Sequence, residues 1–248
     1  MPECDIRIFS SEDELARAAE KIWQEAAAQA LRERNLFVVA LSGGCSPVGL
    51  YRRLVLSKNL PWERTHLFLA DERFVPLEDK DSNYRLINEL LLEPAGIDPS
   101  NCHPVPVAEN SAEAAARRYE EELSDFFSKE GYGSPVFDLV VLGMGRDGHT
   151  ASLFPGNPDL FTTERLTVSV NGGQTRHQRV SLGLSVINSS KNVVFLVSGR
   201  GKAAIVRRVL ERGDSDLPAS RVKPVAGQLF FLLDEDASKQ IKPERGIE

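Results

Sequence analysis

An aspartate and a histidine two positions apart, Asp147 and His149, are the side chains in this sequence that most directly suggest chemistry. They stand in a glycine-rich stretch, residues 143–155, which reads GMGRDGHTASLFP. Histidine titrates near neutral pH and can take a proton from water, and a neighbouring carboxylate can orient the ring and stabilise the imidazolium. The stretch therefore predicts that His149 is a general base with Asp147 as its partner. A histidine that only packs within a turn is the alternative.

Two other interpretations of this stretch fit less well. It contains a literal G-x-G-x-x-G, but a dinucleotide-binding fold places an acidic residue about twenty positions later, at the end of a strand. Glu164 instead stands within Thr-Thr-Glu-Arg, outside any strand pattern. A serine hydrolase needs its nucleophile within G-x-S-x-G, and Ser152 has no such surroundings. The sequence thus disfavours both a nicotinamide cofactor and a serine nucleophile.

A second glycine-rich loop, residues 42–47, reads SGGCSP and joins an apolar strand pattern to a helical one. Glycines let the backbone approach a ligand closely, Ser46 can cap the helix, and Pro47 suits its first position. Backbone N–H groups and the helix dipole then favour an anion such as a phosphate. A turn that binds nothing is the alternative, and the lack of Gly-Lys-Ser/Thr excludes a Walker loop. The candidate binding residues of this loop are Ser42, Gly43, Gly44, Cys45 and Ser46.

Charged side chains lie beside the other strand patterns. Asp71 and Arg73 stand in the loop 70–76, where the Arg73 guanidinium can fork onto phosphate oxygens. Arg179 is the first residue of a strand-like run, and Lys202 lies in the glycine-containing turn Ser-Gly-Arg-Gly-Lys. Solvated surface turns are the alternative for these cations. Residues 81–83 are expected to cap the next helix and to pack near the 70–76 loop.

Strand and helix patterns alternate along the chain and would position these loops. Short apolar runs at 36–41, 67–70, 136–142 and 193–197 are typical of strands buried on both faces of a parallel sheet. A later β pair is expected at 166–170 and 179–184, and an edge strand at 228–233. The expected helices are a first one capped by Ser11 and Glu14, then 48–56, 84–92, 112–127 and 202–210. This order predicts an α/β fold, a mostly parallel sheet with helices on both faces, as a single domain over residues 1–248, with ligands at the carboxyl ends of the strands.

Composition narrows the classes of protein further. The 248 residues are 42% hydrophobic and 27% charged, which suits a globular protein, and the net charge of −6 offers no cationic excess for nucleic acid. The 3 cysteines are far apart, so we expect neither a disulfide framework nor a metal site. No apolar run approaches the roughly 18 residues of a membrane span. A cytoplasmic protein without nucleic-acid or membrane partners is therefore expected.

Taken together, these segments resemble the 6-phosphogluconolactonases of the pentose phosphate pathway. The matching segments are Ser-Gly-Gly-x-x-Pro at 42–47, Asp-Glu-Arg at 71–73 with Val75-Pro76, Ser82-Asn83, the whole of 143–155, Arg-Val-Ser-Leu from Arg179, Val-Ser-Gly-x-x-Lys ending at Lys202, and Leu-Pro-Ala-Ser at 217–220. The resemblance runs over nearly the whole chain. Cys45 departs from it, because relatives usually have Ser or Thr there, so that a hydroxyl contact to phosphate would be lost.

The resemblance implies a Rossmann-like domain shared with glucosamine-6-phosphate deaminases and ribose-5-phosphate isomerases, and an enzyme that works without metal or cofactor. It implies that the substrate is a sugar-phosphate lactone and that His149 activates the water attacking its carbonyl, with Asp147 close by. Arg179 would place the sugar or the developing oxyanion. The residues that it places around the phosphate and the rest of the substrate are Ser42, Gly43, Gly44, Cys45, Ser46, Asp71, Arg73, Gly145 and Lys202.

Two alternatives to a lactonase stay open at this point. Deaminases of aminosugar phosphates resemble this chain but have Asp-Glu-Tyr in place of 71–73 and a catalytic glutamate after Asp-Gly-His, whereas residues 150–155 contain no acid. A sugar-phosphate sensor without activity would have no need of the Asp147 and His149 pair. A monomer or a weak homo-oligomer is expected.

Overall fold

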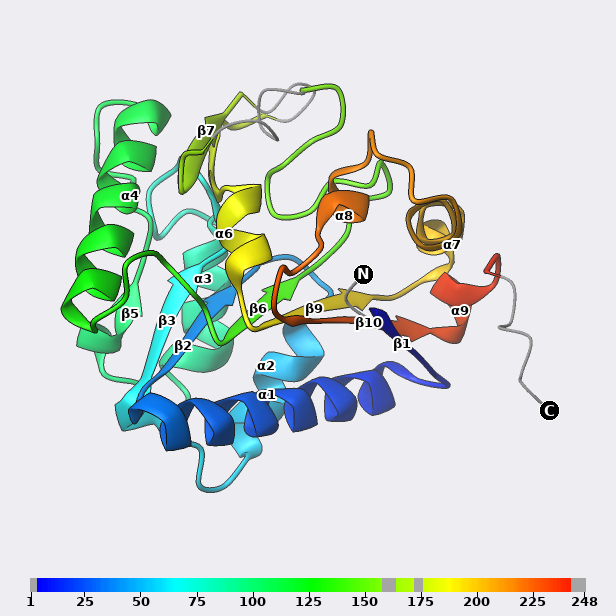
Figure 1. Ribbon diagram of the computed structural model, residues 1–248, viewed down its shortest axis with the longest axis horizontal. Coiled ribbons are helices and arrows are strands. Elements are labelled where there is room, and N and C mark those ends of the chain that lie inside the picture. The colour runs from blue at the N-terminus through cyan, green and yellow to red at the C-terminus, as the bar shows by residue number, and fades with distance from the viewer. Residues whose placement is uncertain (1–3, 158–163, 172–175, 242–248) are drawn as a thin grey trace.

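Seven parallel strands form the central sheet of the computed structural model, which describes residues 4–157, 164–171 and 176–241 (Figure 1). The order across the sheet is β1-β10-β9-β6-β2-β3-β5, and every neighbouring pair is parallel. The strands are β1 (Cys4–Phe9), β2 (Phe37–Leu41), β3 (Thr65–Leu69), β5 (Cys102–His103), β6 (Leu139–Leu142), β9 (Asn192–Val197) and β10 (Gln228–Asp234). The parallel α/β fold expected from the sequence is confirmed.

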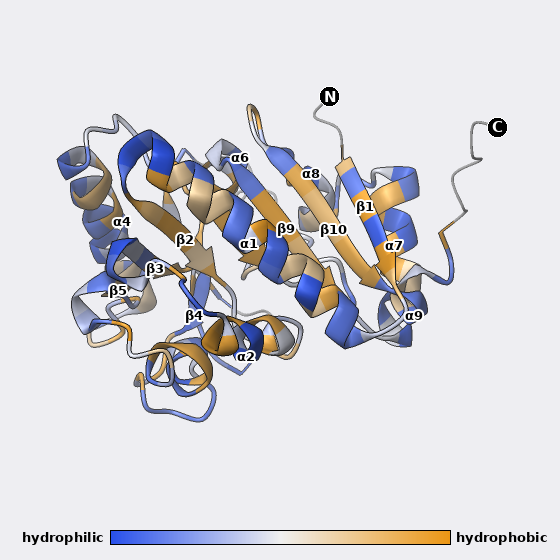
Figure 2. Cartoon of the chain, turned by 90° about the horizontal axis from the view of Figure 1, so that it is seen from below, coloured by the Kyte–Doolittle hydropathy of each residue, from blue (hydrophilic) through white to orange (hydrophobic). Residues whose placement is uncertain are grey.

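Helices cover both faces of this sheet. Figure 1 shows α1 and α2 on one side and α6, α7 and α8 on the other. The central strands β2, β9 and β10 are apolar along most of their length while α1 is polar on its outer side, as Figure 2 shows. The helices are α1 (Glu12–Arg34), α2 (Val48–Leu56), α3 (Asn83–Ile87), α4 (Ala112–Lys129), α6 (Leu184–Ser189), α7 (Ala203–Arg207), α8 (Pro218–Arg221) and α9 (Glu235–Ser238). In the described part of the chain, no helix is long and apolar enough to cross a membrane.

The first helix begins at the predicted cap. The Ser11 hydroxyl accepts a hydrogen bond from the backbone N–H of Glu14 at 3.2 Å. The Glu14 carboxylate in turn accepts a hydrogen bond from the backbone N–H of Ser10 rather than from that of Ser11. The apolar side of this helix, including Ile22 and Trp23, is buried against the sheet. The Ser11 cap and the helical spacing of apolar residues therefore predicted this helix correctly.

Chain order reverses between two central strands. The chain runs from β2 outward through β3 to β5 and then returns to β6, which pairs with the other side of β2. In parallel α/β sheets, such a reversal leaves a crevice at the carboxyl ends of the two strands, because their loops turn away from each other. The glycine-rich loops 42–47 and 143–155 follow β2 and β6, so both begin at this crevice.

The second sheet has three strands, and the sequence predicted only two of them. The β pair is confirmed as β7 (Thr167–Val170) and β8 (Arg179–Leu182), which are antiparallel. Its third strand is β4 (Asp71–Arg73), within a segment that we expected to be a loop. Its partner β8 lies far along the chain, so no local pattern could reveal the pairing.

One further expectation about a strand was wrong. β10 was predicted to be an edge strand but lies between β1 and β9. The edge strands are β1 and β5, and neither was predicted from the sequence. Ile6 and Ile8 on β1 are exposed, so this strand lacks the continuous apolar run of a buried one.

Three helices also differ from the predicted pattern. Helix α2 starts with Pro47 at the cap position and without a side-chain cap bond, so Ser46 does not cap it as expected. The segments expected to be helical at 84–92 and 202–210 each end in a π-helical turn, at Asn88–Leu92 and Arg208–Arg212. Residues Arg200–Lys202 form a 3-10 turn before α7.

A chain of two histidines and a glutamate at the β3–β5 edge of the sheet links stability to pH. His66 Nδ1 lies 3.0 Å from His103 Nε2, and His103 Nδ1 lies 2.9 Å from a carboxylate oxygen of Glu122. Phe68 stacks on the His103 ring at 4.1 Å. Burial and, to a lesser extent, the charge of His103 lower the pKa of His66 from 6.5 to about 4.

We expect acid to destabilise the protein through His66. Because its pKa is lower in the folded state, the unfolded chain binds the extra proton between about pH 6.5 and pH 4, so stability is lost as pH falls through that window. His66 is only half-buried, so solvent screening limits the loss to on the order of 1 kcal/mol. Urea unfolding at pH 7 and pH 4.5 should show a smaller loss for His66→Gln than for the wild type. Equal losses in both proteins would contradict this assignment.

Candidate active site

A cavity of about 500 Å³ lies where the loops after β2, β6 and β9 meet the second sheet. Its walls contain every candidate binding residue from the sequence, together with His149. The lining residues are Ser42, Gly43, Gly44, Cys45, Ser46, Asp71, Arg73, Asn83, Gly143, Met144, Gly145, Arg146, His149, Ala151, Arg179, Ser198 and Lys202. Asp147 lies directly behind His149 and bonds to its ring. The fold thus gathers side chains from segments far apart in the sequence.

The pair formed by Asp147 and His149 has the geometry of an oriented base. An Asp147 carboxylate oxygen, Oδ1, lies 2.6 Å from His149 Nδ1 and also accepts a bond from the His149 N–H at 3.2 Å. Burial opposes ionisation of Asp147, but His149 and the backbone bond lower the pKa of Asp147 below its ordinary value overall. An ionised Asp147 holds the proton on Nδ1, so Nε2 has its lone pair available.

Backbone geometry around this pair leaves no room for larger residues. A Cβ on Gly145 would lie 2.1 Å from His149 Nδ1 and 2.4 Å from Asp147 Oδ1. Gly148 has φ +86, which favours glycine, and Ala151 has φ 46 despite its side chain. A non-glycine residue in this left-handed region costs about 1–2 kcal/mol. The loop therefore holds backbone strain next to the candidate base.

The loop after β2 approaches the cavity with its backbone. Gly44 has φ +83, and a Cβ on Gly43 would lie only 2.0 Å from Asn83 Oδ1. The buried Tyr51 hydroxyl donates to the Ser42 carbonyl at 2.6 Å and fixes the start of the loop. Because its two glycines have no side chains, this loop can bring backbone N–H groups close to an anion.

Two arginines face each other across the second sheet. Arg73 on β4 is the register partner of Arg179 on β8, and both line the cavity. Like charges directly opposite in a strand pair destabilise it. Arg73 Nη1 donates to the Asp81 carbonyl at 2.7 Å, but the Nε atoms of both arginines are buried without a hydrogen-bond partner. The pair is therefore suited to an anionic ligand.

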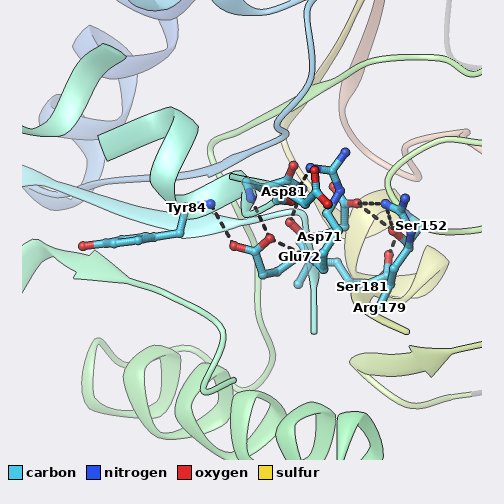
Figure 3. A network of polar contacts seen from close by, with 10 residues as sticks. Asp71, Glu72, Asp81, Tyr84, Ser152, Arg179 and Ser181 are labelled. Atoms are coloured by element: carbon cyan, nitrogen blue, oxygen red, sulfur yellow. Dashed lines mark hydrogen bonds and ion pairs between the residues drawn. The ribbon is translucent and has the colours of Figure 1, made fainter. Parts of the chain in front are cut away.

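The buried carboxylate of Glu72 anchors the segment that carries Arg73 (Figure 3). It accepts bonds from the N–H groups of Arg73, Asn83 and Tyr84, at 2.7–2.8 Å, and from the Ser82 hydroxyl at 3.0 Å. Burial raises the pKa of Glu72 although these four donors lower it. Ser82 also caps α3, as predicted, by accepting from the N–H of the third helical residue. Glu72 thus joins β4 to α3 and positions Arg73 at the cavity.

Asp71 supports the neighbouring arginine rather than standing free in the cavity. Its Oδ2 accepts a bond of 2.6 Å from the Ser152 hydroxyl and lies 3.8 Å from Arg179 Nη1 (Figure 3). Burial has the largest effect on the pKa of Arg179 and lowers it, whereas the negative charge of Asp71 raises it. Ser152 is fully buried, which agrees with the argument against a serine nucleophile.

Lys202 lines the cavity from the turn after β9. Its ammonium group donates to the Met144 carbonyl, so the turn after β9 is tied to the loop after β6. Burial, followed by the nearby positive charge of Arg146, lowers the pKa of Lys202. Asp147 and Cys45 act in the opposite direction, which places Lys202 within electrostatic reach of both glycine-rich loops.

Several residues that line this cavity had no binding role predicted from the sequence. They include Asn83, Arg146 and Ser198. Asn83 Nδ2 donates to the Asp71 carbonyl at 2.9 Å, while its buried Oδ1 has no partner. Arg146 stands within the glycine-rich stretch 143–155 itself, and this position is the sequence feature that could have identified it as a cavity residue. Within the described residues, no group of three or more His, Cys, Asp or Glu is arranged to hold a metal ion.

Known proteins of one family resemble this chain over most of its length. Residues 10–231 match the family described as glucosamine-6-phosphate isomerases/6-phosphogluconolactonase. The chain belongs to this family. A 6-phosphogluconolactonase from Synechocystis is 40% identical over 218 residues, which cover 87% of this chain and 89% of the relative.

Solved structures of both branches of the family have the same fold. A 6-phosphogluconolactonase from Thermotoga maritima has a TM-score of 0.81 at 31% identity, covering 94% of this chain and 100% of its own. A monomeric glucosamine-6-phosphate deaminase has a TM-score of 0.79 at 25% identity, covering 96% and 100%. The backbone alone therefore separates the two activities poorly, and side chains must decide between them.

We expect Gly145→Ala to disable this family member without unfolding it. The added Cβ must displace His149 and Asp147, and misplacement of a reacting group by about 1 Å costs on the order of a hundredfold in rate. Gly133→Ala is the matched control, because a Cβ there has nothing within 4 Å. Lactone hydrolysis and thermal melting of both variants test this. Wild-type turnover in Gly145→Ala would contradict the importance of the pair's geometry.

Proposed function

We propose that this chain hydrolyses 6-phospho-D-glucono-1,5-lactone to 6-phospho-D-gluconate with His149 as general base. The observation that supports this mechanism is the His149 ring, which lines the cationic cavity while its Nδ1 is bonded to Asp147. The family and its lactonase members supply the reaction class. This reaction is the second step of the oxidative pentose phosphate pathway.

In this mechanism, Nε2 of His149 accepts a proton from a water molecule as the water oxygen attacks C1 of the lactone. Asp147 stabilises the imidazolium that forms. The tetrahedral intermediate collapses with breakage of the bond between C1 and the ring oxygen, and His149 returns the proton to that oxygen. The base ends the cycle neutral, so no further group is needed to reset it.

The phosphate group supplies binding energy far from the bond that breaks. Arg73, Lys202 and the backbone of residues 43–46 would hold it, so that the carbonyl is fixed against the water on His149. Arg179 lies near the ring of Phe154, which itself packs 4.6 Å from the His149 ring. This location suits a donor to the sugar or to the developing oxyanion.

A deaminase activity is less compatible with these side chains. Aminosugar ring opening and proton shuttling rely on a glutamate in the loop that here reads Thr-Ala-Ser-Leu-Phe-Pro. Among the described residues, no glutamate lines the cavity, and the acid that does, Asp71, is engaged by Ser152 and Arg179. Ammonia release from glucosamine 6-phosphate is accordingly expected to be at background.

His149→Ala should reduce kcat for lactone hydrolysis by about 10²–10⁴-fold, because a general base contributes that much. Binding of 6-phosphogluconate should change little, since the phosphate contacts stay in place. The assay generates the lactone in place from glucose 6-phosphate and subtracts the spontaneous rate. Near-normal turnover in the variant would exclude His149 as the base. Binding without acceleration by the wild type would instead favour a sensor.

Arg73→Ala and Lys202→Ala should raise KM more than they lower kcat. Each variant loses a charge-assisted contact worth about 1.5–3 kcal/mol, which corresponds to a rise in KM of roughly tenfold or more. Steady-state kinetics on the lactone measures both parameters. Unchanged KM in both variants would contradict their role in holding the phosphate.

A further inference from the structure

Arg146 is a cation at the cavity that has no counter-charge of its own. It stands between Gly145 and Asp147, lines the same cavity as His149 and Lys202, and is exposed. Among the described residues, it makes no hydrogen bond or ion pair. Arg117 and Arg208, which are exposed on helical segments, each pair with an acid. The position of Arg146 at the cavity is therefore not explained by a hydrogen bond or an ion pair within the described part of the chain.

The chain makes room for this guanidinium on the turn that carries Lys202. A Cβ on Gly201 would lie 2.9 Å from Arg146 Nε and 3.0 Å from Cζ and Nη2. The guanidinium therefore packs against the bare backbone of the residue before Lys202. Two segments far apart in the sequence thus place two cations side by side.

Placing two positive charges together is unfavourable unless an anion joins them. Arg146 opposes the protonation of Lys202, and Asp147, the acid that acts on Lys202, is already bonded to His149. Cys45 of the glycine-rich loop after β2 also lies within electrostatic reach of Lys202. Arg146, Lys202 and Cys45 all line the same cavity, and a dianionic phosphate there would be stabilised by both positive charges.

We propose that Arg146 is a phosphate-binding residue of this chain, which acts together with Lys202 and determines the preference for phosphorylated over unphosphorylated ligands. The inference rests on the proposed function for the identity of the ligand. Arg146 is thereby a specificity-determining residue, and it takes no part in proton transfer.

The decisive measurement is calorimetric binding of 6-phosphogluconate and of unphosphorylated gluconate to purified variants. Arg146→Ala should raise the Kd for 6-phosphogluconate about five- to tenfold, a modest effect because the side chain is exposed and screened. Arg146→Lys should retain part of the affinity, because the charge remains. In kinetics on the lactone, Arg146→Ala should raise KM by a similar factor with kcat nearly unchanged.

Arg200→Ala is the matched control. Arg200 is an exposed arginine on the same turn as Lys202, but it does not line the cavity and its charge acts on Asp236 instead. Its replacement should leave both Kd and KM within twofold of wild type. A loss of equal size in Arg200→Ala would show a general effect of surface charge and overturn the proposal.

Gly201→Ala supplies a second variant that leaves every candidate contact residue in place. Its Cβ should push the guanidinium of Arg146 away and raise the Kd for 6-phosphogluconate in the wild-type background. In the Arg146→Ala background, the same change should have no effect, because there is no guanidinium left to displace. Equal effects in both backgrounds would contradict the packing on which the inference stands.

The outcomes separate this inference from the proposed function. If wild type binds 6-phosphogluconate but does not accelerate lactone hydrolysis, the proposed function fails while the role of Arg146 is still measured by binding. If wild type is an active lactonase and Arg146→Ala binds 6-phosphogluconate within twofold of wild type, the inference fails alone. Equal weakening of gluconate and 6-phosphogluconate binding would also overturn it, because the contact would then not be with the phosphate.

Discussion

Repulsion between cations around a single cavity is the constraint on which the rest of this structure depends. Arg73 faces Arg179 across a strand pair, and the guanidinium of Arg146 packs on the turn that carries Lys202. Neither arrangement stabilises a fold by itself, since like charges close together raise its free energy. Packing must therefore hold these side chains in place. An anionic ligand relieves this repulsion when it binds, which makes its binding free energy more favourable.

The supporting contacts show how the fold tolerates this arrangement. Glu72 accepts four hydrogen bonds that lock β4 onto α3, and Asp71 lies beneath Arg179. Gly145 leaves space for the His149 ring, and Ala151 accepts a left-handed backbone in the same loop. Each contact fixes a side chain before a ligand arrives. This preorganisation removes the ordering cost that flexible side chains would add to binding and catalysis.

Sequence patterns predicted the parts of this architecture that depend on neighbouring residues. Helix α2 and the buried runs of β2 and β9 follow from local periodicity, and the Asp147–His149 pair is only two residues apart. Strand β4 escaped detection because its partner β8 lies about a hundred residues away, and β1 because its outer residues are exposed. The role of Arg146 was hidden for a similar reason, since it depends on Gly201 and Lys202. Sequence patterns reveal local structure. Repulsion between charges that are far apart in the sequence becomes visible only when the fold brings them together.

Most of the cations of the cavity stand outside the loop that holds the candidate base, which suits a scaffold shared by two reactions. Arg73, Arg179 and Lys202 come from β4, β8 and the turn after β9, whereas Arg146 shares the loop after β6 with Asp147 and His149. A lactonase and a deaminase resemble this chain almost equally in backbone, with TM-scores of 0.81 and 0.79. In the proposed function, a framework of cations holds the sugar phosphate, and the loop 143–155 sets the reaction while adding Arg146 to the phosphate contacts. In this chain, that loop contains one histidine and one aspartate but no glutamate, a set that fits the proposed transfer of a proton from water rather than the opening of an aminosugar ring.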